Sequence, residues 1–127
     1  MDIPDARDIP DVVAEEEPLH RRIHPTFLKP DGSVSSQAFQ DPEMSVDRGR
    51  YRALVDTLRG FPRYGVACLI TFAVRQLGQE VLPAKELFNP AHALVKGDKP
   101  KSIARKLAKA SDWVVQLGGA PTLGGLG

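Results

Sequence analysis

The sequence contains few of the residues that mark a secreted or membrane-spanning protein. Cys68 is the only cysteine among 127 residues, so no disulfide can form within the chain. No apolar run approaches the roughly 18 residues that a membrane-spanning helix needs. The first residues, MDIPDARDIPDVVAEEE, are acidic and lack the basic and apolar regions of a signal peptide. We therefore expect a cytoplasmic protein without contact to a membrane, in which Cys68 is a buried and unreactive thiol.

Motifs for metals, phosphates and nucleophilic catalysis are missing as well. His20 and His24 would lie about 13 Å apart on one strand, too far to share an ion, and His92 belongs to a distant segment. Neither a G-x-x-x-x-G-K-[ST] nor a G-x-G-x-x-G phosphate loop occurs, and no G-x-S-x-G nucleophile turn is present. The sequence predicts no metal site and no cofactor.

Charge is distributed unevenly along the chain. Residues 1–18 have a balance of −6, whereas the remainder has a balance of +7. The low apolar content of residues 1–18 predicts a disordered acidic tail, and glycine in residues 118–127 predicts a second flexible tail. Residues 19–117 remain as one domain. Because the net charge of this domain is opposite to that of the acidic tail, we expect the tail to cover part of the basic helix described below.

Several segments have the apolar patterns of strands. LHRRIH at 19–24 alternates, and shorter strands are expected at 44–46 and 91–95. Residues 63–83 fit either a strand or a helix, because both faces are apolar. We favour a central strand ending near Arg75, a bend at Gly78 and a second strand over 79–83.

Two helices complete the expected fold. The first covers residues 48–59, with Asp47 as its N-terminal cap and an apolar face of Tyr51, Leu54, Val55 and Leu58. The second runs from Pro100 to Val115. Its apolar stripe consists of Ile103, Leu107, Ala110 and Val114. Without regular βαβ alternation, these elements predict an α+β fold: a small, mostly antiparallel sheet packed against a C-terminal amphipathic basic helix and one shorter helix.

The C-terminal helix carries the densest charge in the chain. Its side opposite the apolar stripe is basic, and the preceding turn adds further lysines. Clustered bases bind acidic protein surfaces and nucleic acids, and a nearby indole can stack on a base, although solvated faces also have this composition. The expected function is that of a non-enzymatic interaction domain that docks an acidic protein partner or nucleic acid. The expected site is Lys96, Lys99, Lys101, Arg105, Lys106, Lys109 and Trp113.

An enzymatic alternative rests on the N-terminal strand. His20, Arg21 and Arg22 are followed by the serine pair Ser35 and Ser36, an order that resembles the NAD-using ADP-ribosyltransferases. The resemblance implies a small NAD- or nucleotide-using enzyme centred on Arg21, Arg22, Ser35 and Ser36. The chain departs from that family in lacking its late E-x-E motif. This enzyme would require the polar groups to converge in one pocket.

Overall fold

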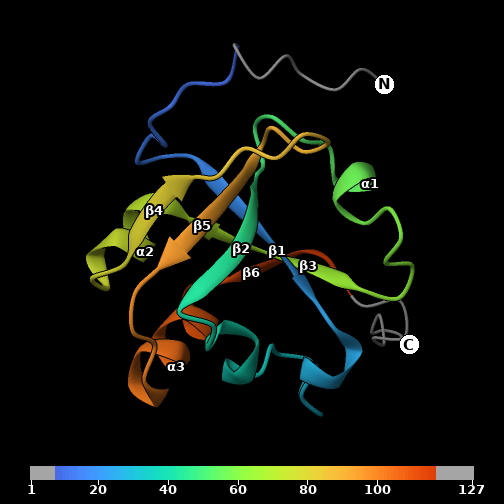
Figure 1. The fold of residues 1–127 in the computed structure, drawn as a ribbon. Coiled ribbons are helices and arrows are strands. Elements are labelled where there is room, and N and C mark those ends of the chain that lie inside the picture. The colour runs from blue at the N-terminus through green and yellow to red at the C-terminus, as the bar shows by residue number, and fades with distance from the viewer. Residues whose placement is uncertain (1–7, 117–127) are drawn as a thin grey trace.

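A six-stranded antiparallel sheet forms the centre of the structure, a computed structural model that describes residues 8–116 (Figure 1). The strands are arranged in the order β4-β5-β2-β1-β3-β6. They are β1 Pro18–Ile23, β2 Glu43–Arg48, β3 Gly65–Ile70, β4 Glu80–Pro83, β5 His92–Lys96 and β6 Asp112–Val115. The predicted strands at 19–24, 44–46 and 91–95 are therefore confirmed, and so is the α+β class.

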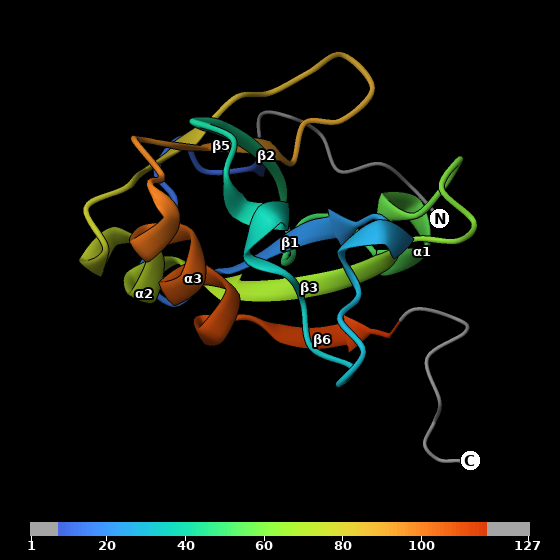
Figure 2. The same cartoon turned by 90° about the horizontal axis from the view of Figure 1, so that it is seen from below.

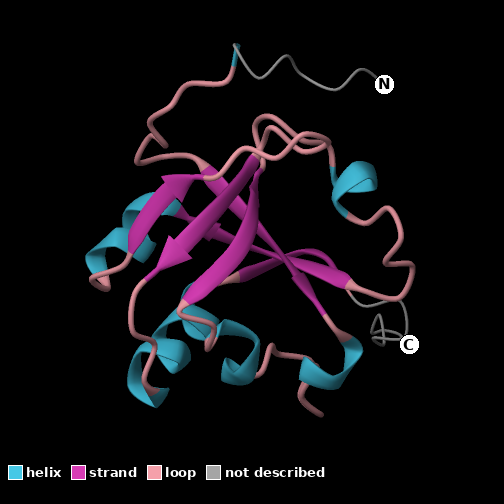
Figure 3. Ribbon diagram, in the orientation of Figure 1, coloured by secondary structure: helices cyan, strands magenta, loops and turns pink. Residues whose placement is uncertain are grey.

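Short helices surround the sheet (Figure 3). The α-helices are α1 Leu54–Thr57, α2 Thr71–Gln76 and α3 Lys101–Ala110, and two 3₁₀ turns are η2 Pro25–Phe27 and η3 Ser36–Phe39. α3 packs beside η3 (Figure 2). Within residues 8–116, no helix has the length and apolar character required to cross a bilayer.

Alternation along the strands separates an apolar from a polar face of the sheet. Leu19 and Ile23 of β1 point into the core, where Leu107 and Ala104 of α3 are also fully buried. His20 has the opposite orientation, since successive strand side chains point to opposite faces. The core face is covered by α3 and η3, and the other face carries the polar residues described below.

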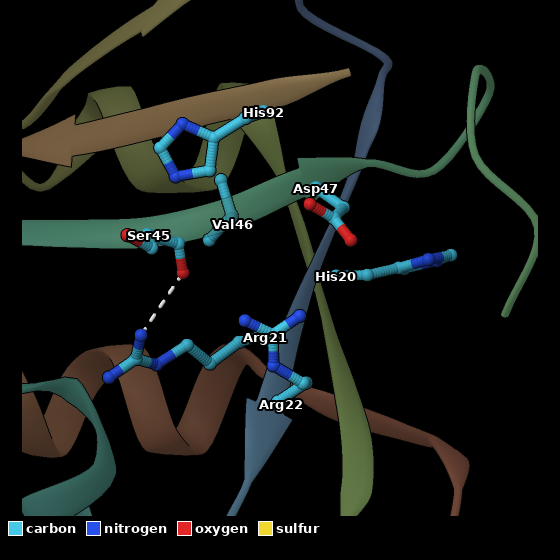
Figure 4. Close-up of a pocket in the computed structure, with 7 residues that line it drawn as sticks. All are labelled: His20, Arg21, Arg22, Ser45, Val46, Asp47 and His92. Atoms are coloured by element: carbon cyan, nitrogen blue, oxygen red, sulfur yellow. Dashed lines mark hydrogen bonds between the residues drawn. The ribbon is translucent and has the colours of Figure 1, made fainter. Parts of the chain in front are cut away.

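The sheet opens between β1 and β2. These strands share only the pairs Leu19–Arg48 and His20–Asp47, whereas β1 pairs with β3 over its whole length. Arg21 fills the opening: its Nε donates to the Ala38 carbonyl at 3.2 Å and its Nη1 to the Ser45 carbonyl at 3.0 Å (Figure 4). The guanidinium thus supplies donors to backbone carbonyls where the ladder between the strands ends.

The segment before β1 packs on the domain, so the expected disordered tail is wrong for residues 8–18. Ile9 and Val13 are buried, and Glu17 is 1% exposed beside Arg48. Two buried apolar side chains and this buried ion pair anchor the acidic segment on the domain. Residues 1–7 and the predicted flexible tail at 118–127 lie outside the described residues.

The carboxylates of residues 8–18 that form ion pairs do not pair with the basic helix α3. Glu15 pairs with Arg75 and Asp11 with Lys85, while Glu17 binds Arg48. These partners belong to β2, α2 and the β4–β5 loop. The expectation that the acids shield the C-terminal helix is therefore wrong for these three carboxylates.

The helix predicted over 48–59 is mostly wrong. β2 continues through Asp47 and Arg48, and α1 contains only four residues, preceded by Ala53 rather than an Asp47 cap. The side chains of Asp47 and Arg48 take their partners from distant segments, Asn89 and Glu17. Buried long-range bonds of this kind outweigh a local helix signal.

The ambiguous region 63–83 contains both expected strands and a helix between them. β3 ends at Ile70, five residues before the predicted end. The Thr71 hydroxyl then donates to the Glu17 carbonyl at 2.8 Å where α2 begins. Gly78, whose φ is 81°, follows α2 and leads the chain into β4. A mixed apolar pattern here reflects a strand that changes directly into a helix.

The C-terminal helix is shorter than predicted. α3 ends at Ala110, and residues 112–115 form β6 against β3. Ala110 is exposed and Val114 is 43% exposed, so neither belongs to the core. The predicted stripe is confirmed at Leu107 and, as a half-buried residue, at Ile103.

Candidate functional site

Four bases of α3 form an exposed positive surface. Lys101, Arg105, Lys106 and Lys109 are all exposed, and we call them the α3 basic surface. Within residues 8–116, no carboxylate forms an ion pair with any of them. Ala104 and Leu107 anchor the opposite side of the helix in the core. The surface is therefore held on a rigid element and is open to solvent.

Three residues expected at this surface lie elsewhere. Lys99 is 7% exposed, and its Nζ donates to the Val95 and Gly97 carbonyls at 2.8 and 3.1 Å. Burial lowers the pKa of Lys99, while the charge of Asp41 opposes part of that change. The ammonium group satisfies the carbonyls at the end of β5, so we correct its expected binding role to a structural one.

Lys96 and Trp113 are also separated from the α3 basic surface. Lys96 Nζ lies 3.9 Å from Glu43 Oε2 across the paired strands β5 and β2. Trp113 belongs to β6, and its Nε1 donates to the Gly32 carbonyl at 2.9 Å. The half-buried indole packs against the core, so its expected stacking on a partner is not supported.

The arginines of the enzymatic alternative line one small cavity, but the two serines do not join them there. Arg21 reaches the carbonyls of Ala38 and Ser45, whereas Arg22, on the other side of the strand, donates through Nη1 to the Thr57 carbonyl at 3.1 Å. Ser35 caps η3 by accepting from the Gln37 amide. The two cavities described below are not lined by Ser35 or Ser36. The NAD-using enzyme stays a prediction without support from this geometry.

Asp47 joins three segments on the polar face of the sheet. The residue is 4% exposed, its Oδ2 accepts from the Thr57 hydroxyl at 2.8 Å, and its Oδ1 accepts from Asn89 Nδ2 at 2.8 Å. Arg52 Nε lies 3.7 Å from the same carboxylate. No local pattern predicts this role of Asp47, because Asn89 is distant in the chain and residues 48–59 have the apolar spacing of a helix.

Two histidines flank Asp47 on adjacent strands (Figure 4). His92 Nδ1 lies 2.9 Å from the Ala84 carbonyl, an acceptor, so Nδ1 carries the proton. The buried Nδ1 of His20 has no hydrogen-bond partner, and burial lowers the pKa of His20 against the opposing charge of Asp47. A cavity of about 20 Å³ between these groups has room for one water molecule and no larger ligand.

A larger cavity opens beside the loop between β4 and β5. Its volume is about 420 Å³, and it is a wide depression open to solvent. Within the loop, Glu86 and Asn89 exchange two backbone hydrogen bonds, of 3.0 and 3.1 Å, which closes a tight turn with Leu87 and Phe88 at its tip. The lining residues are Arg22, Arg52, Glu86, Leu87, Phe88 and Asn89, which we call the arginine pocket.

Comparisons of the chain with family models, curated proteins and solved structures found no match. In the described part of the chain, no group of three or more histidine, cysteine, aspartate or glutamate side chains is arranged to hold a metal ion. The α3 basic surface and the arginine pocket are therefore the two candidate binding sites of the described residues.

Proposed function

We propose that the protein is a non-enzymatic interaction domain that docks an acidic segment of a partner protein on the α3 basic surface. The observation that carries this proposal is the set of four exposed bases that have no carboxylate partner within residues 8–116. Arg48 and Arg75, in contrast, each form an ion pair with an acid. Uncompensated positive charge on one helix attracts a negatively charged partner and favours its correct orientation.

The spacing of the bases suits an acidic peptide. Lys101, Arg105 and Lys109 follow one another at intervals of four residues, which is a rise of about 6 Å per interval on a helix. Acidic side chains at alternate positions of an extended chain are about 6.6 Å apart. A short extended segment with alternating acids can therefore place one carboxylate near each base in this row.

Nucleic acid fits the same surface less well. Proteins that hold single strands combine a basic groove with exposed aromatic rings on which bases stack. Trp113 is not free for that task, because it donates to the Gly32 carbonyl and packs against the core. The Lys99 ammonium group donates to the backbone carbonyls of Val95 and Gly97 and is therefore not available to a phosphate. These two losses favour a protein partner over a polynucleotide.

The test compares two probes that differ in class. Binding of a decapeptide of alternating glutamate and serine, and of a decameric oligothymidylate, is measured by calorimetry at low salt. We expect the peptide to bind and to shift the NMR signals of α3 amides, with weakening at high salt because exposed charges are screened. Tighter binding of the oligonucleotide would replace the protein partner by nucleic acid, and binding of neither probe would contradict the proposal.

We also propose that the domain works in the cytoplasm. The one thiol, Cys68, is free and partly buried, and burial raises its pKa, which keeps it in the unreactive thiol form. A free thiol of this kind is compatible with a reducing compartment. Localisation of a fluorescently labelled full chain tests the proposal, and an extracytoplasmic signal would contradict it.

A further inference from the structure

The arginine pocket has more hydrogen-bond donors than acceptors. Arg22 and Arg52 each carry five N–H donors. One donor of each is used on a backbone carbonyl: Arg22 Nη1 binds the Thr57 carbonyl, and Arg52 Nη2 binds the Asp56 carbonyl at 3.0 Å. These bonds attach the two guanidinium groups to the carbonyls of adjacent residues at the end of α1. Their remaining donors are available to a group that brings its own acceptors.

The acceptors that line the pocket do not balance these donors. Both ends of the Asn89 amide are engaged, Nδ2 with Asp47 and Oδ1 with the Ala91 amide at 3.2 Å. The carboxylate of Glu86 is 59% exposed and lies 3.9 Å from His92 Nδ1. Asp47 offsets part of the charge of Arg52, but its Oδ2 lies 3.7 Å from Arg52 Nε, beyond hydrogen-bond distance, so it uses none of the Arg52 donors. A ligand group with several acceptor oxygens would pair with the N–H donors of Arg22 and Arg52 that remain free.

The rim of the same pocket is apolar. Leu87 is 87% exposed and Phe88 is 79% exposed. Adjacent large apolar side chains with this much exposure are uncommon on protein surfaces and often mark binding sites. The two hydrogen bonds between Glu86 and Asn89 fix both residues at the tip of a tight turn. Arg22 already stacks on an aromatic ring, with its Cζ 4.1 Å from the centroid of Phe61. The pocket therefore combines two guanidinium groups with the exposed ring of Phe88.

From this combination we infer that the arginine pocket is a binding site for a small aromatic oxyanion, with Arg22 and Arg52 on the phosphate or carboxylate and Phe88 against the ring. Guanidinium groups bind such oxyanions in a planar, forked geometry. Aromatic rings of ligand and protein gain further free energy from offset or edge contacts. This site is separate from the α3 basic surface and does not depend on the proposed docking function.

The test uses phenyl phosphate, benzoate, inorganic phosphate and benzyl alcohol on the full chain, followed by calorimetry and by NMR shifts of the Glu86–Asn89 amides. We expect millimolar or tighter binding of phenyl phosphate, benzoate or both, and the better of the two identifies the oxyanion. Phe88→Ala should weaken the aromatic anion about 3–10-fold without changing inorganic phosphate. Phe72→Ala, at another exposed ring on α2, should have no effect.

Arginine variants distinguish the pocket from general anion binding. Arg22→Lys, which retains charge but loses the fork, should weaken the better aromatic anion about tenfold or more, with the melting temperature as a folding control. The triple variant Arg105→Glu, Lys106→Glu, Lys109→Glu should leave its affinity unchanged. Loss of binding in that triple variant but not in Phe88→Ala would overturn the site, as would the absence of binding by both aromatic anions.

Discussion

Arg48 and Glu17 form a bidentate ion pair in the protein interior. Arg48 Nε lies 2.9 Å from Glu17 Oε1 and Nη2 lies 2.9 Å from Oε2, with both side chains at most 2% exposed. Two of the three remaining donors of Arg48 reach the carbonyls of Pro10 and Val12 at 2.6 and 3.2 Å. One buried arginine thus attaches the acidic N-terminal segment to the sheet.

We expect Glu17→Gln to lower the free energy of unfolding by about 3–5 kcal/mol, because the variant leaves a buried guanidinium without its counter-charge. Urea denaturation measures the loss. The matched control is Glu16→Gln at the exposed neighbouring position, for which we expect a change within about 0.5 kcal/mol. Similar values for the two variants would show that the buried pair does not stabilise the domain.

The same pair predicts how acid affects stability. Burial raises the pKa of Glu17, but hydrogen bonds from Arg48 and the Ala14 amide, with the Arg48 charge, outweigh burial and hold the pKa below its ordinary value. The stabilisation is therefore complete above the unfolded pKa of about 4.3 and is lost as pH falls through the lower folded pKa. Unfolding curves over a pH series should show a smaller loss in acid for Glu17→Gln. Parallel curves would contradict this assignment.

Gly49 is required by the ring of His20. A Cβ at position 49 would lie 2.6 Å from His20 Cε1 and 2.8 Å from Nε2. We expect Gly49→Ala to cost about 1–3 kcal/mol through overcrowding. In a His20→Ala background the same substitution should cost little, because the ring is gone. A thermal-melting double-mutant cycle measures this coupling, and equal costs in both backgrounds would place the cause elsewhere.

Asp47 should hold α1 and the Glu86–Asn89 turn in place. Asp47→Ala removes acceptors from Thr57 and Asn89, at a cost of about 1.5–3 kcal/mol. Hydrogen exchange of the Asn89 amide should accelerate more than exchange at α3 amides. Asp112→Ala, at an exposed acid in β6, is the control. Uniform acceleration across the chain would show global destabilisation without a local role.

Leu107 is the core anchor of α3. We expect Leu107→Ala to cost about 2–5 kcal/mol, because the side chain is fully buried and leaves a cavity. Val114→Ala changes a 43% exposed residue of β6 and should cost far less. The free energies of unfolding of both variants, measured with denaturant, test whether Leu107 and not Val114 belongs to the core. Equal costs would mean that Val114 shares the core with Leu107.

Local patterns were sufficient for elements whose apolar residues contact the core through one face. Alternation identified β1, and Pro100, Ile103 and Leu107 located the start and buried side of α3. The end of α3 was missed because Trp113, Val114 and Val115 continue the helical spacing. Their aromatic and β-branched side chains equally suit a strand, and pairing with β3 decides for the strand.

The roles of the candidate-site residues were harder to predict than the fold, because they depend on contacts between segments that are distant in sequence. The four exposed bases of α3 followed from helical periodicity, but the burial of Lys99 depends on carbonyls that the fold places around it. Asp47 was interpreted as a helix cap, but its carboxylate accepts from Asn89 instead. Their hydrogen bond joins positions 42 residues apart, and no periodicity of either segment encodes that pairing.

The α3 basic surface is the proposed docking site of an acidic partner. The most direct test of this proposal is the affinity of the glutamate–serine decapeptide for two charge-reversed chains. We expect Arg105→Glu, Lys106→Glu, Lys109→Glu to abolish binding, and Lys29→Glu, Arg59→Glu, Arg63→Glu, which reverses as much charge at exposed positions elsewhere, to retain most of it. Equal loss of affinity in both triple variants would mean that net charge alone attracts the peptide, and that result would contradict the account.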